Sequence, residues 1–231
     1  HEWLPIRSPD PARPEKIFRS FNFGDLVSLH MLDTRVIARD RQLDYAAYLG
    51  IDGSLDGARF AADLADPARQ LLGSEQLLWL QGQLAGSSAT WQILGQQVLM
   101  GRMNIPAPVV LRQIGFSAYA ALLAKARTAP GSLPAEERAI LAQPAIPYNL
   151  DAWDGYAIAR ETVLGMVRSH DKNLVVLAGD THNAWASDLQ DYQGNAVGVE
   201  YAVAAVSSPG LEAYFPDEDP IAVAAGLEAI I

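Results

Sequence analysis

The most constraining feature of the sequence is a short, uninterrupted apolar run, Leu174–Ala178, that follows a helical pattern. Apolar side chains recur at helical spacing from Tyr156 to Val167, and we expect this helix to run to about Ser169. A continuous apolar run of this length is typical of a strand buried in the interior of a sheet. Helix followed by buried strand favours an α/β fold.

Other segments indicate that the sheet of this α/β fold is mixed. Residues 21–35 alternate between two faces, which predicts a strand with Asp33 near its C-terminal end. Further strands are predicted over residues 91–100, 184–189 and 197–206. Further helices are predicted from Ser74 and over residues 111–126 and 135–142.

Composition narrows the class of protein. Hydrophobic residues make up 50% of the chain and charged residues 19%, which describes a folded globular protein. The net charge of −10 disfavours nucleic acid as a stable partner, although metal ions can locally invert the field for a phosphate ester. No apolar run approaches the ~20 residues of a membrane-spanning helix. The chain has no cysteine, which excludes disulfides and thiolate ligands within it.

The segment Gly179–Asn183 (GDTHN) holds the strongest candidates for chemistry. Asp180 and His182 are two residues apart after the buried strand, so in an extended exit both side chains can point to one side. Open α/β sheets bind ligands at this edge. A carboxylate suits a hard cation and an imidazole suits a transition-metal ion, while the Asn183 amide can reach a substrate oxygen. In the alternative interpretation, Asp180 caps backbone N–H groups and His182 lies on the surface.

Two further segments carry charged residues beside predicted elements. In NLDAWDGY, Asp151 and Asp154 can cap the following helix, where the helix dipole favours Asp154, or one of them can bind a metal ion. In LDTR, Asp33 and Arg35 follow a predicted strand. That pair can be structural, or Arg35 can hold a phosphate through two hydrogen bonds. The residues alone leave these alternatives open.

Seven segments of the chain, in order, resemble alkaline phosphatase D (PhoD-like) proteins. They are HEWLPIR, LDTR with RDRQL, LLGSEQLLWL, WQILGQQVLM, NLDAWDGY, VVLAGDTHNAWASDL and VGVEYAVAAVSSPG, within residues 1–214. The resemblance implies an α/β fold, a four-layer α/β/β/α metallophosphoesterase sandwich with mixed sheets. It also implies hydrolysis of phosphate monoesters or diesters with Ca²⁺ and Fe³⁺, or with other divalent metals.

The resemblance also assigns roles to residues of this chain. His182 would be a metal ligand, and Asp180 would be a ligand or a group that orients His182. Asp154, or alternatively Asp151, would bind calcium. Arg35 and Asn183 would lie at or near the phosphate, so that the catalytic residues would be Asp180, His182, Asn183 and Arg35.

One departure from the family concerns its N-terminal half, which supplies most metal-binding aspartates and has no counterpart here. The resemblance therefore predicts that residues 1–231 are the C-terminal portion of the catalytic domain, with an incomplete sandwich that is inactive alone. Unpaired sheet edges would favour its aggregation. The resemblance implies a periplasmic or secreted location, and no signal peptide is expected within residues 1–231.

Two other functions remain open from the sequence. The chain can be a non-catalytic binding or structural domain that retains the fold but lacks the ligands. It can also be a metal-independent hydrolase that uses Asp180, His182 and a serine such as Ser207. The second alternative is disfavoured because no G-x-S-x-G nucleophile elbow surrounds Ser207.

Overall fold

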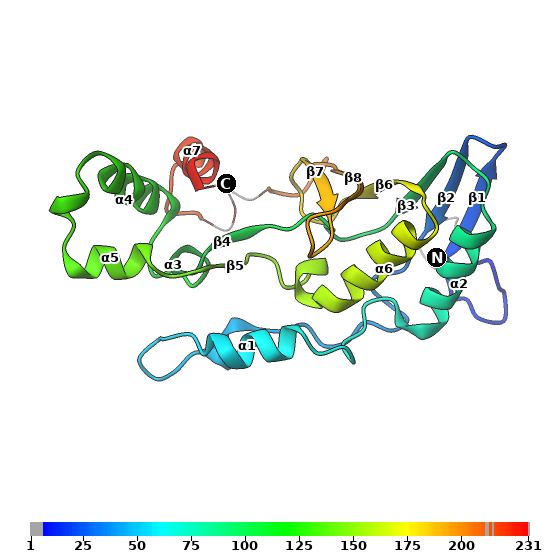
Figure 1. Cartoon of the computed structure of the whole chain (residues 1–231), viewed down its shortest axis with the longest axis horizontal. Coiled ribbons are helices and arrows are strands. Elements are labelled where there is room, and N and C mark those ends of the chain that lie inside the picture. Colours follow the sequence, from blue (N-terminus) through cyan, green and yellow to red (C-terminus); the bar gives the residue numbers. More distant parts are fainter. Residues whose placement is uncertain (1–6, 211–212, 214, 231) are drawn as a thin grey trace. The chain divides into compact units, whose positions relative to one another are not determined.

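A computed structural model describes residues 7–210, 213 and 215–230 of the chain (Figure 1). Its residues form two compact units, residues 1–102 with 150–206 and residues 103–149 with 207–231. The first six residues of the HEWLPIR segment, and Tyr214, lie outside the described residues. Among the described residues, no helix combines the length and the apolar character that crossing a membrane requires.

The first unit is built on a six-stranded mixed sheet in the order β1-β2-β3-β6-β8-β7. Its four inner strands run parallel, and the two edge strands are antiparallel to their neighbours. The mixed α/β architecture that the sequence predicts is confirmed. The strands are β1 Arg19–Phe23, β2 Val27–Met31, β3 Trp91–Gly95, β6 Asn173–Ala178, β7 Trp185–Gln190 and β8 Ala196–Ala202.

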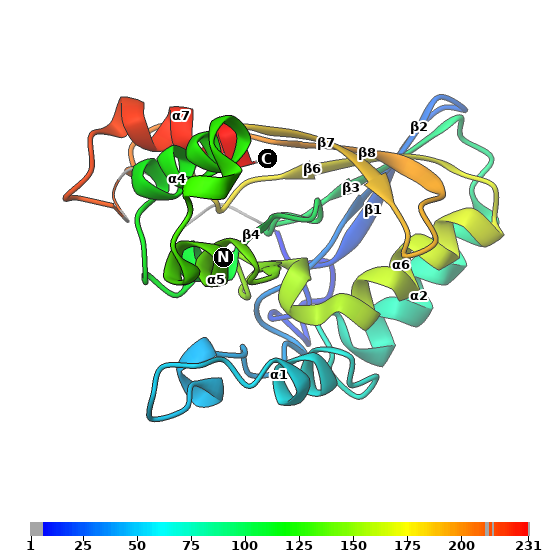
Figure 2. The same cartoon turned by 60° about the vertical axis from the view of Figure 1, so that its left-hand side comes forward.

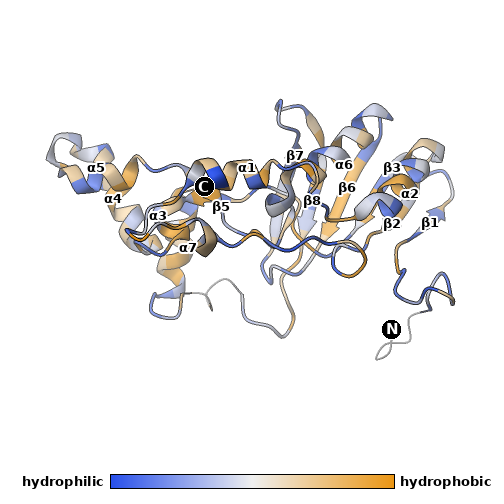
Figure 3. Cartoon of the chain, turned by 90° about the horizontal axis from the view of Figure 1, so that it is seen from below, coloured by the Kyte–Doolittle hydropathy of each residue, from blue (hydrophilic) through white to orange (hydrophobic). Residues whose placement is uncertain are grey.

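Two helices, α2 (Gly73–Gly86) and α6 (Ala157–Ser169), pack on one face of this sheet, which we call the covered face (Figure 2). The α6 helix matches the predicted range and ends just before Asp171, which has a left-handed φ of 50°. Hydropathy colouring shows the apolar character of β6 (Figure 3). Completely buried side chains of this core come from both helices and from the strands: Leu80, Leu84, Leu94, Val163, Val167 and Val176.

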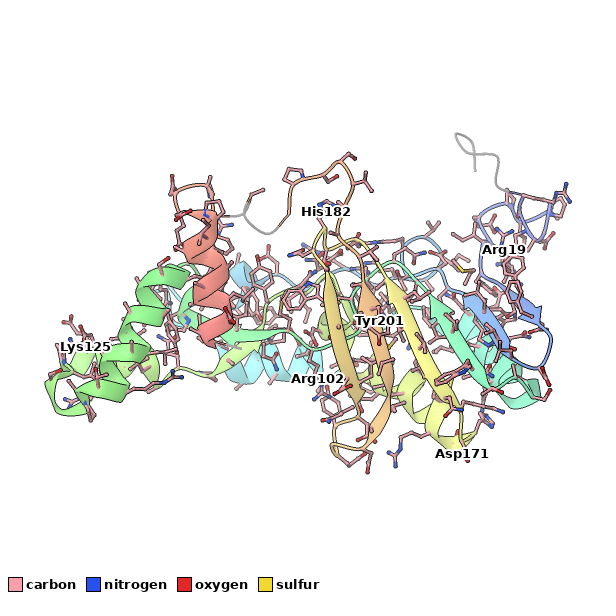
Figure 4. All side chains as sticks on the ribbon, turned by 90° about the horizontal axis from the view of Figure 1, so that it is seen from above. Arg19, Arg102, Lys125, Asp171, His182 and Tyr201 are labelled. Atoms are coloured by element: carbon pink, nitrogen blue, oxygen red, sulfur yellow. The ribbon has the colours of Figure 1, made fainter. Side chains whose placement is uncertain are left out.

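The other face of the same sheet, which we call the open face, is also apolar. Leu29, Ile93, Val175 and Val199 lie side by side across β2, β3, β6 and β8. Figure 4 looks onto this face, with Tyr201 of β8 labelled. The exposed apolar side chains of the open face are Phe21, Phe23, Met31, Trp91, Leu177 and Tyr201.

A smaller apolar cluster in the first unit lies outside the sheet. It joins the 3₁₀ helix η1 (Tyr45–Tyr48) to helix α1 (Gly57–Leu64) through the buried rings of Tyr48 and Phe60, with Leu150. The Asp56 carboxylate caps α1 by accepting the N–H of Arg59 at 3.0 Å. A third short helix, η3 (Trp153–Tyr156), directly precedes α6.

The second unit is mostly helical. A two-stranded antiparallel ribbon, β4 (Asn104–Pro106) with β5 (Ala145–Pro147), forms its only sheet among the described residues. Helix α7 (Pro220–Ile230) packs closely on α4 (Phe116–Thr128), because Gly226 leaves room for the Phe116 backbone. The helices are α3 Ala107–Val110, α4 Phe116–Thr128, η2 Pro130–Ser132, α5 Ala135–Leu141 and α7 Pro220–Ile230.

Four predicted boundaries were wrong, and one of them is the strand predicted over residues 197–206, which ends at Ala202. The single strand predicted over residues 21–35 is a hairpin, since Gly24 turns the chain with a φ of 60°. The strand predicted to reach Met100 ends at Gly95. The helix predicted from Leu111 begins at Phe116, because Arg112 has a left-handed φ of 55° and ends α3.

Candidate active site

The sheet brings two predicted segments to one edge. LDTR (Leu32–Arg35) follows β2, and GDTHN (Gly179–Asn183) follows β6. Both strands are parallel to β3, which lies between them, so the two loops leave the sheet at the same carboxyl edge, on either side of β3. Open α/β sheets place their ligand sites at this edge.

Gln97, just beyond β3, holds both loops. Its side-chain Oε1 accepts the N–H and the hydroxyl of Thr34 at 2.8 and 2.6 Å, and its Nε2 donates to the Leu32 carbonyl at 3.0 Å. Its own carbonyl accepts the N–H of Gly179 at 3.2 Å. No local sequence signal marks this role, because the two loops that Gln97 joins are far from it along the chain.

In LDTR, Asp33 shapes the loop and Arg35 extends from it. Asp33 is 1% exposed, and its carboxylate accepts the N–H groups of Arg35 and Val36 at 2.9 Å and of Ile37 at 3.2 Å. The Gln76 side-chain amide holds the Asp33 backbone through two hydrogen bonds. Its Oε1 accepts the Asp33 N–H at 2.8 Å, and its Nε2 donates to the Asp33 carbonyl at 2.8 Å. Asp33 is therefore structural, while the partly exposed Arg35 side chain is available for contacts outside its own loop.

The GDTHN loop is a tight turn, as the sequence predicts, and not the extended exit in which Asp180 and His182 could point to one side. Asp180 and His182 both adopt the left-handed conformation, with φ values of 64° and 61°. The Thr181 N–H donates to the Gly179 carbonyl at 2.7 Å, and the Thr181 hydroxyl donates to the Asn183 carbonyl at 3.4 Å. Non-glycine residues in this conformation are uncommon and concentrate at functional sites.

Arg35 joins three segments of the chain through two ion pairs. Its Nη1 lies 2.7 Å from Asp151 Oδ2, and its Nη2 lies 2.6 Å from Asp180 Oδ1. Burial lowers the pKa of Arg35, but hydrogen bonding to Asp151 and the charges of both carboxylates outweigh it, so the pKa lies above its ordinary value. LDTR, NLDAWDGY and GDTHN thus meet at one guanidinium.

The two aspartates of NLDAWDGY have different surroundings. Asp151 is partly exposed and contacts Arg35 and Arg39. Asp154 is 8% exposed and lies on η3. Burial raises the pKa of Tyr45, and the charge of Asp154 raises it further. The N-cap of α6 is Tyr156 rather than either aspartate, and it makes no side-chain capping bond.

The predicted metal ligands do not form a complete coordination site within this chain. Among the described residues, no group of three or more histidine, cysteine, aspartate or glutamate side chains is placed to hold one ion. Asp180 and Asp151 each direct a carboxylate oxygen at Arg35. A site built on His182, Asp180 and either Asp154 or Asp151 alone therefore does not fit the geometry.

Comparisons with known proteins agree along nearly the whole chain. The family model described as PhoD-like phosphatase matches residues 1–227. Alkaline phosphatase D of Bacillus subtilis (strain 168) is 29% identical over 218 residues, which cover 91% of this chain and 30% of that protein. A solved structure titled "Structure of PhoD" has a TM-score of 0.59 and 30% identity, covering 90% of this chain and 32% of that one. The chain thus spans about a third of the length of these relatives.

Proposed function

We propose that this chain, which belongs to the PhoD-like phosphatase family, is part of a metal-dependent phosphoesterase that hydrolyses phosphate monoesters or diesters. The observation that carries the proposal is the meeting of three segments at Arg35, at the ligand-binding edge of the sheet. The substrate is a phosphate ester, and periplasmic or secreted location follows from the family resemblance.

Arg35 is the group we assign to the substrate phosphate. A guanidinium presents two parallel N–H donors that match two oxygens of a phosphate, and Arg35 is one-third exposed at its side chain. Asp180 holds one of its amino groups until substrate arrives. The Asn183 amide and the His182 imidazole, on the same loop as Asp180, are the polar groups that we place beside the ester oxygens.

The metal ions of this proposal, Ca²⁺ and Fe³⁺, need ligands from outside the described residues. We propose that Asp180 and His182 contribute an oxygen and a nitrogen donor, and that Asp154 or Asp151 is the next candidate in this chain. These donor types suit a hard cation and a transition-metal ion respectively. The other ligands would come from another part of the protein.

The open face of the sheet supports the proposal that residues 1–231 are the C-terminal portion of a longer catalytic domain. Strands that are apolar on both faces are typical of sheets covered on both sides. In this chain α2 and α6 cover one face, while Trp91, Leu177 and Tyr201 on the other are exposed. We propose that a second sheet, supplied by the N-terminal half, packs there and completes the α/β/β/α sandwich.

The test is hydrolysis of p-nitrophenyl phosphate and of its bis-ester, by this chain and by the natural polypeptide that contains it. Each is assayed with Ca²⁺ and Fe³⁺, with EDTA, and with the His182→Ala and Asp180→Asn substitutions. We expect turnover only in the longer polypeptide, lost in EDTA and in both variants. Turnover that survives EDTA would favour the metal-independent alternative, and no turnover with any metal would favour a non-catalytic domain.

Asp171→Asn is the matched control for Asp180→Asn. Asp171 is also an aspartate with a left-handed φ, here 50°, but it lies at the other end of β6 from the GDTHN loop, as the labels Asp171 and His182 show in Figure 4. Asparagine tolerates this backbone conformation, so neither substitution adds strain. The control should retain turnover, and equal losses at both positions would contradict the assignment.

A further inference from the structure

We infer that Asp151 is a positioning residue that aims Arg35, and that Arg39 in turn fixes Asp151. Both carboxylate oxygens of Asp151 are engaged by arginines: Oδ2 by Arg35 Nη1 at 2.7 Å, and Oδ1 by Arg39 Nη2. Arg39 Nη2 also donates to the Asp151 carbonyl at 2.6 Å. This inference rests on the proposed function, and it removes Asp151 from the candidate metal ligands.

The Arg39 side chain is held in place by burial and by several contacts. It is only 11% exposed, and its Nη1 donates to the Thr34 carbonyl at 3.2 Å. Its guanidinium lies over the buried ring of Tyr156, 4.9 Å from the centroid. Tyr156 is anchored by a 2.7 Å hydrogen bond from its hydroxyl to the Asp40 carbonyl. Stacking on an aromatic ring combined with a planar set of donors is a role that lysine cannot reproduce.

The order of the charges explains how Arg39, through Asp151, sets the position of the Arg35 side chain. Arg39, Asp151, Arg35 and Asp180 alternate in sign, and each contacts the next. With Oδ1 held by Arg39, the Asp151 carboxylate keeps Oδ2 directed at Arg35. A long arginine side chain otherwise loses rotamer freedom when it binds a ligand. Arg35 is therefore ordered before a phosphate arrives.

A double-mutant cycle distinguishes a positioning role from a metal-binding role. The natural polypeptide that contains this chain is prepared as wild type, Asp151→Asn, Arg35→Met and the double variant, and assayed with p-nitrophenyl phosphate. Bound metal is measured by elemental analysis. We expect Asp151→Asn to raise KM by about tenfold, the scale of one weakened hydrogen bond to a charged group, with a smaller change in kcat. It should have no further effect in the Arg35→Met background, and metal content should not change.

Two outcomes would overturn the inference. One is an Asp151→Asn loss of the same factor in both backgrounds, and the other is a loss of bound metal on Asp151→Asn. The first would show that Asp151 acts independently of Arg35, and the second would make Asp151 a metal ligand. A wild type without turnover would instead overturn the proposed function and this inference together.

A second variant, at Arg39, changes the side chain less and therefore disturbs folding less. Arg39→Lys keeps the positive charge but removes the second donor and the stacking, and we expect it to raise KM about as much as Asp151→Asn does. Arg41→Lys is the matched control, because Arg41 is the exposed arginine of the same RDR sequence. An Arg39→Lys enzyme with the KM of the Arg41→Lys control would contradict the role of Arg39.

Discussion

Both faces of the six-stranded sheet carry apolar side chains, but these side chains are differently buried. On the covered face, Leu94 and Val176 are completely buried under α2 and α6. On the open face of the same two strands, Trp91 and Leu177 are 43% and 44% exposed. A sheet that faces water on one side normally alternates apolar and polar side chains, and these strands do not.

The difference shows that these strands are suited to burial on both faces, whereas the described elements cover only one. An apolar patch spread over neighbouring strands marks an interaction surface or a liability to aggregate. The covered face should therefore determine whether the unit folds, and the open face should determine what the unit binds. Three experiments test this division, from the largest expected effect to the smallest.

Truncating a side chain on the covered face should cost most. Leu94→Ala leaves a cavity among α2, α6 and β6, and we expect it to lower the free energy of unfolding by about 2–5 kcal/mol. The matched change Leu177→Ala on the open face should lower it by less than about 1 kcal/mol, since no packed core collapses there. Urea denaturation at a concentration low enough to keep the chain monomeric measures both, and equal losses would mean that the open face is buried in the monomer.

Introducing charged side chains on the open face should have the next largest effect, and this effect should be on association rather than on folding. We expect the chain to self-associate, and Leu177→Lys with Tyr201→Lys to make it monomeric in light scattering after gel filtration. Burial of such side chains contributes roughly 1.5–3 kcal/mol each. In the longer polypeptide that we propose, the same substitutions should destabilise the domain. A wild-type chain that is monomeric at high concentration would contradict this expectation.

The smallest effect should come from a titratable group on the covered face. His30 is 1% exposed, its Nε2 lies 3.0 Å from Gln92 Oε1 and its Nδ1 lies 2.7 Å from Ser20 Oγ. Burial lowers the pKa of His30, although the hydrogen bond with Gln92 partly opposes this. Below about pH 6.5 the unfolded chain therefore binds a proton that the folded chain does not.

The sign of the pH effect follows from that difference. Stability should fall as the pH falls below about 6.5, by at most about 1.4 kcal/mol per pH unit from this one group. Denaturation of wild type and His30→Gln at pH 7.5 and 5.5 isolates the contribution of His30. The variant should lose less stability between the two values, and an identical loss would show that the imidazole is accessible to protons in the folded chain.

Much of the first unit could be predicted from the sequence because its signals are local. Strand β6 and helix α6 follow directly from an apolar run and from helical spacing, and both appear where predicted. The β1–β2 hairpin was missed because its apolar alternation continues on both sides of Gly24. A periodic pattern identifies a strand, but it does not show where the chain reverses.

The candidate site was only partly predictable, because local sequence patterns do not show which segments meet in space. The motifs containing Arg35, Asp151 and Asp180 stand out in the sequence, since charged residues follow or precede strong elements. Their meeting at one guanidinium does not stand out, nor does the contribution of Gln97. Arg39 was missed entirely, because its function depends on Asp151, 112 positions further along the chain. Such roles are set by strand order, which local patterns do not specify.

The ion pair between Arg35 and Asp180 joins residues 145 positions apart, and this separation has a consequence for folding kinetics. Contacts between distant residues form slowly, because the chain must first close a long loop, and parallel strands share this property. No fragment confined to one of the three motifs can assemble the site. During refolding, the ion pair between Arg35 and Asp180 should therefore form only as β2, β3 and β6 pair, and its recovery would report on the slowest topological step of this unit.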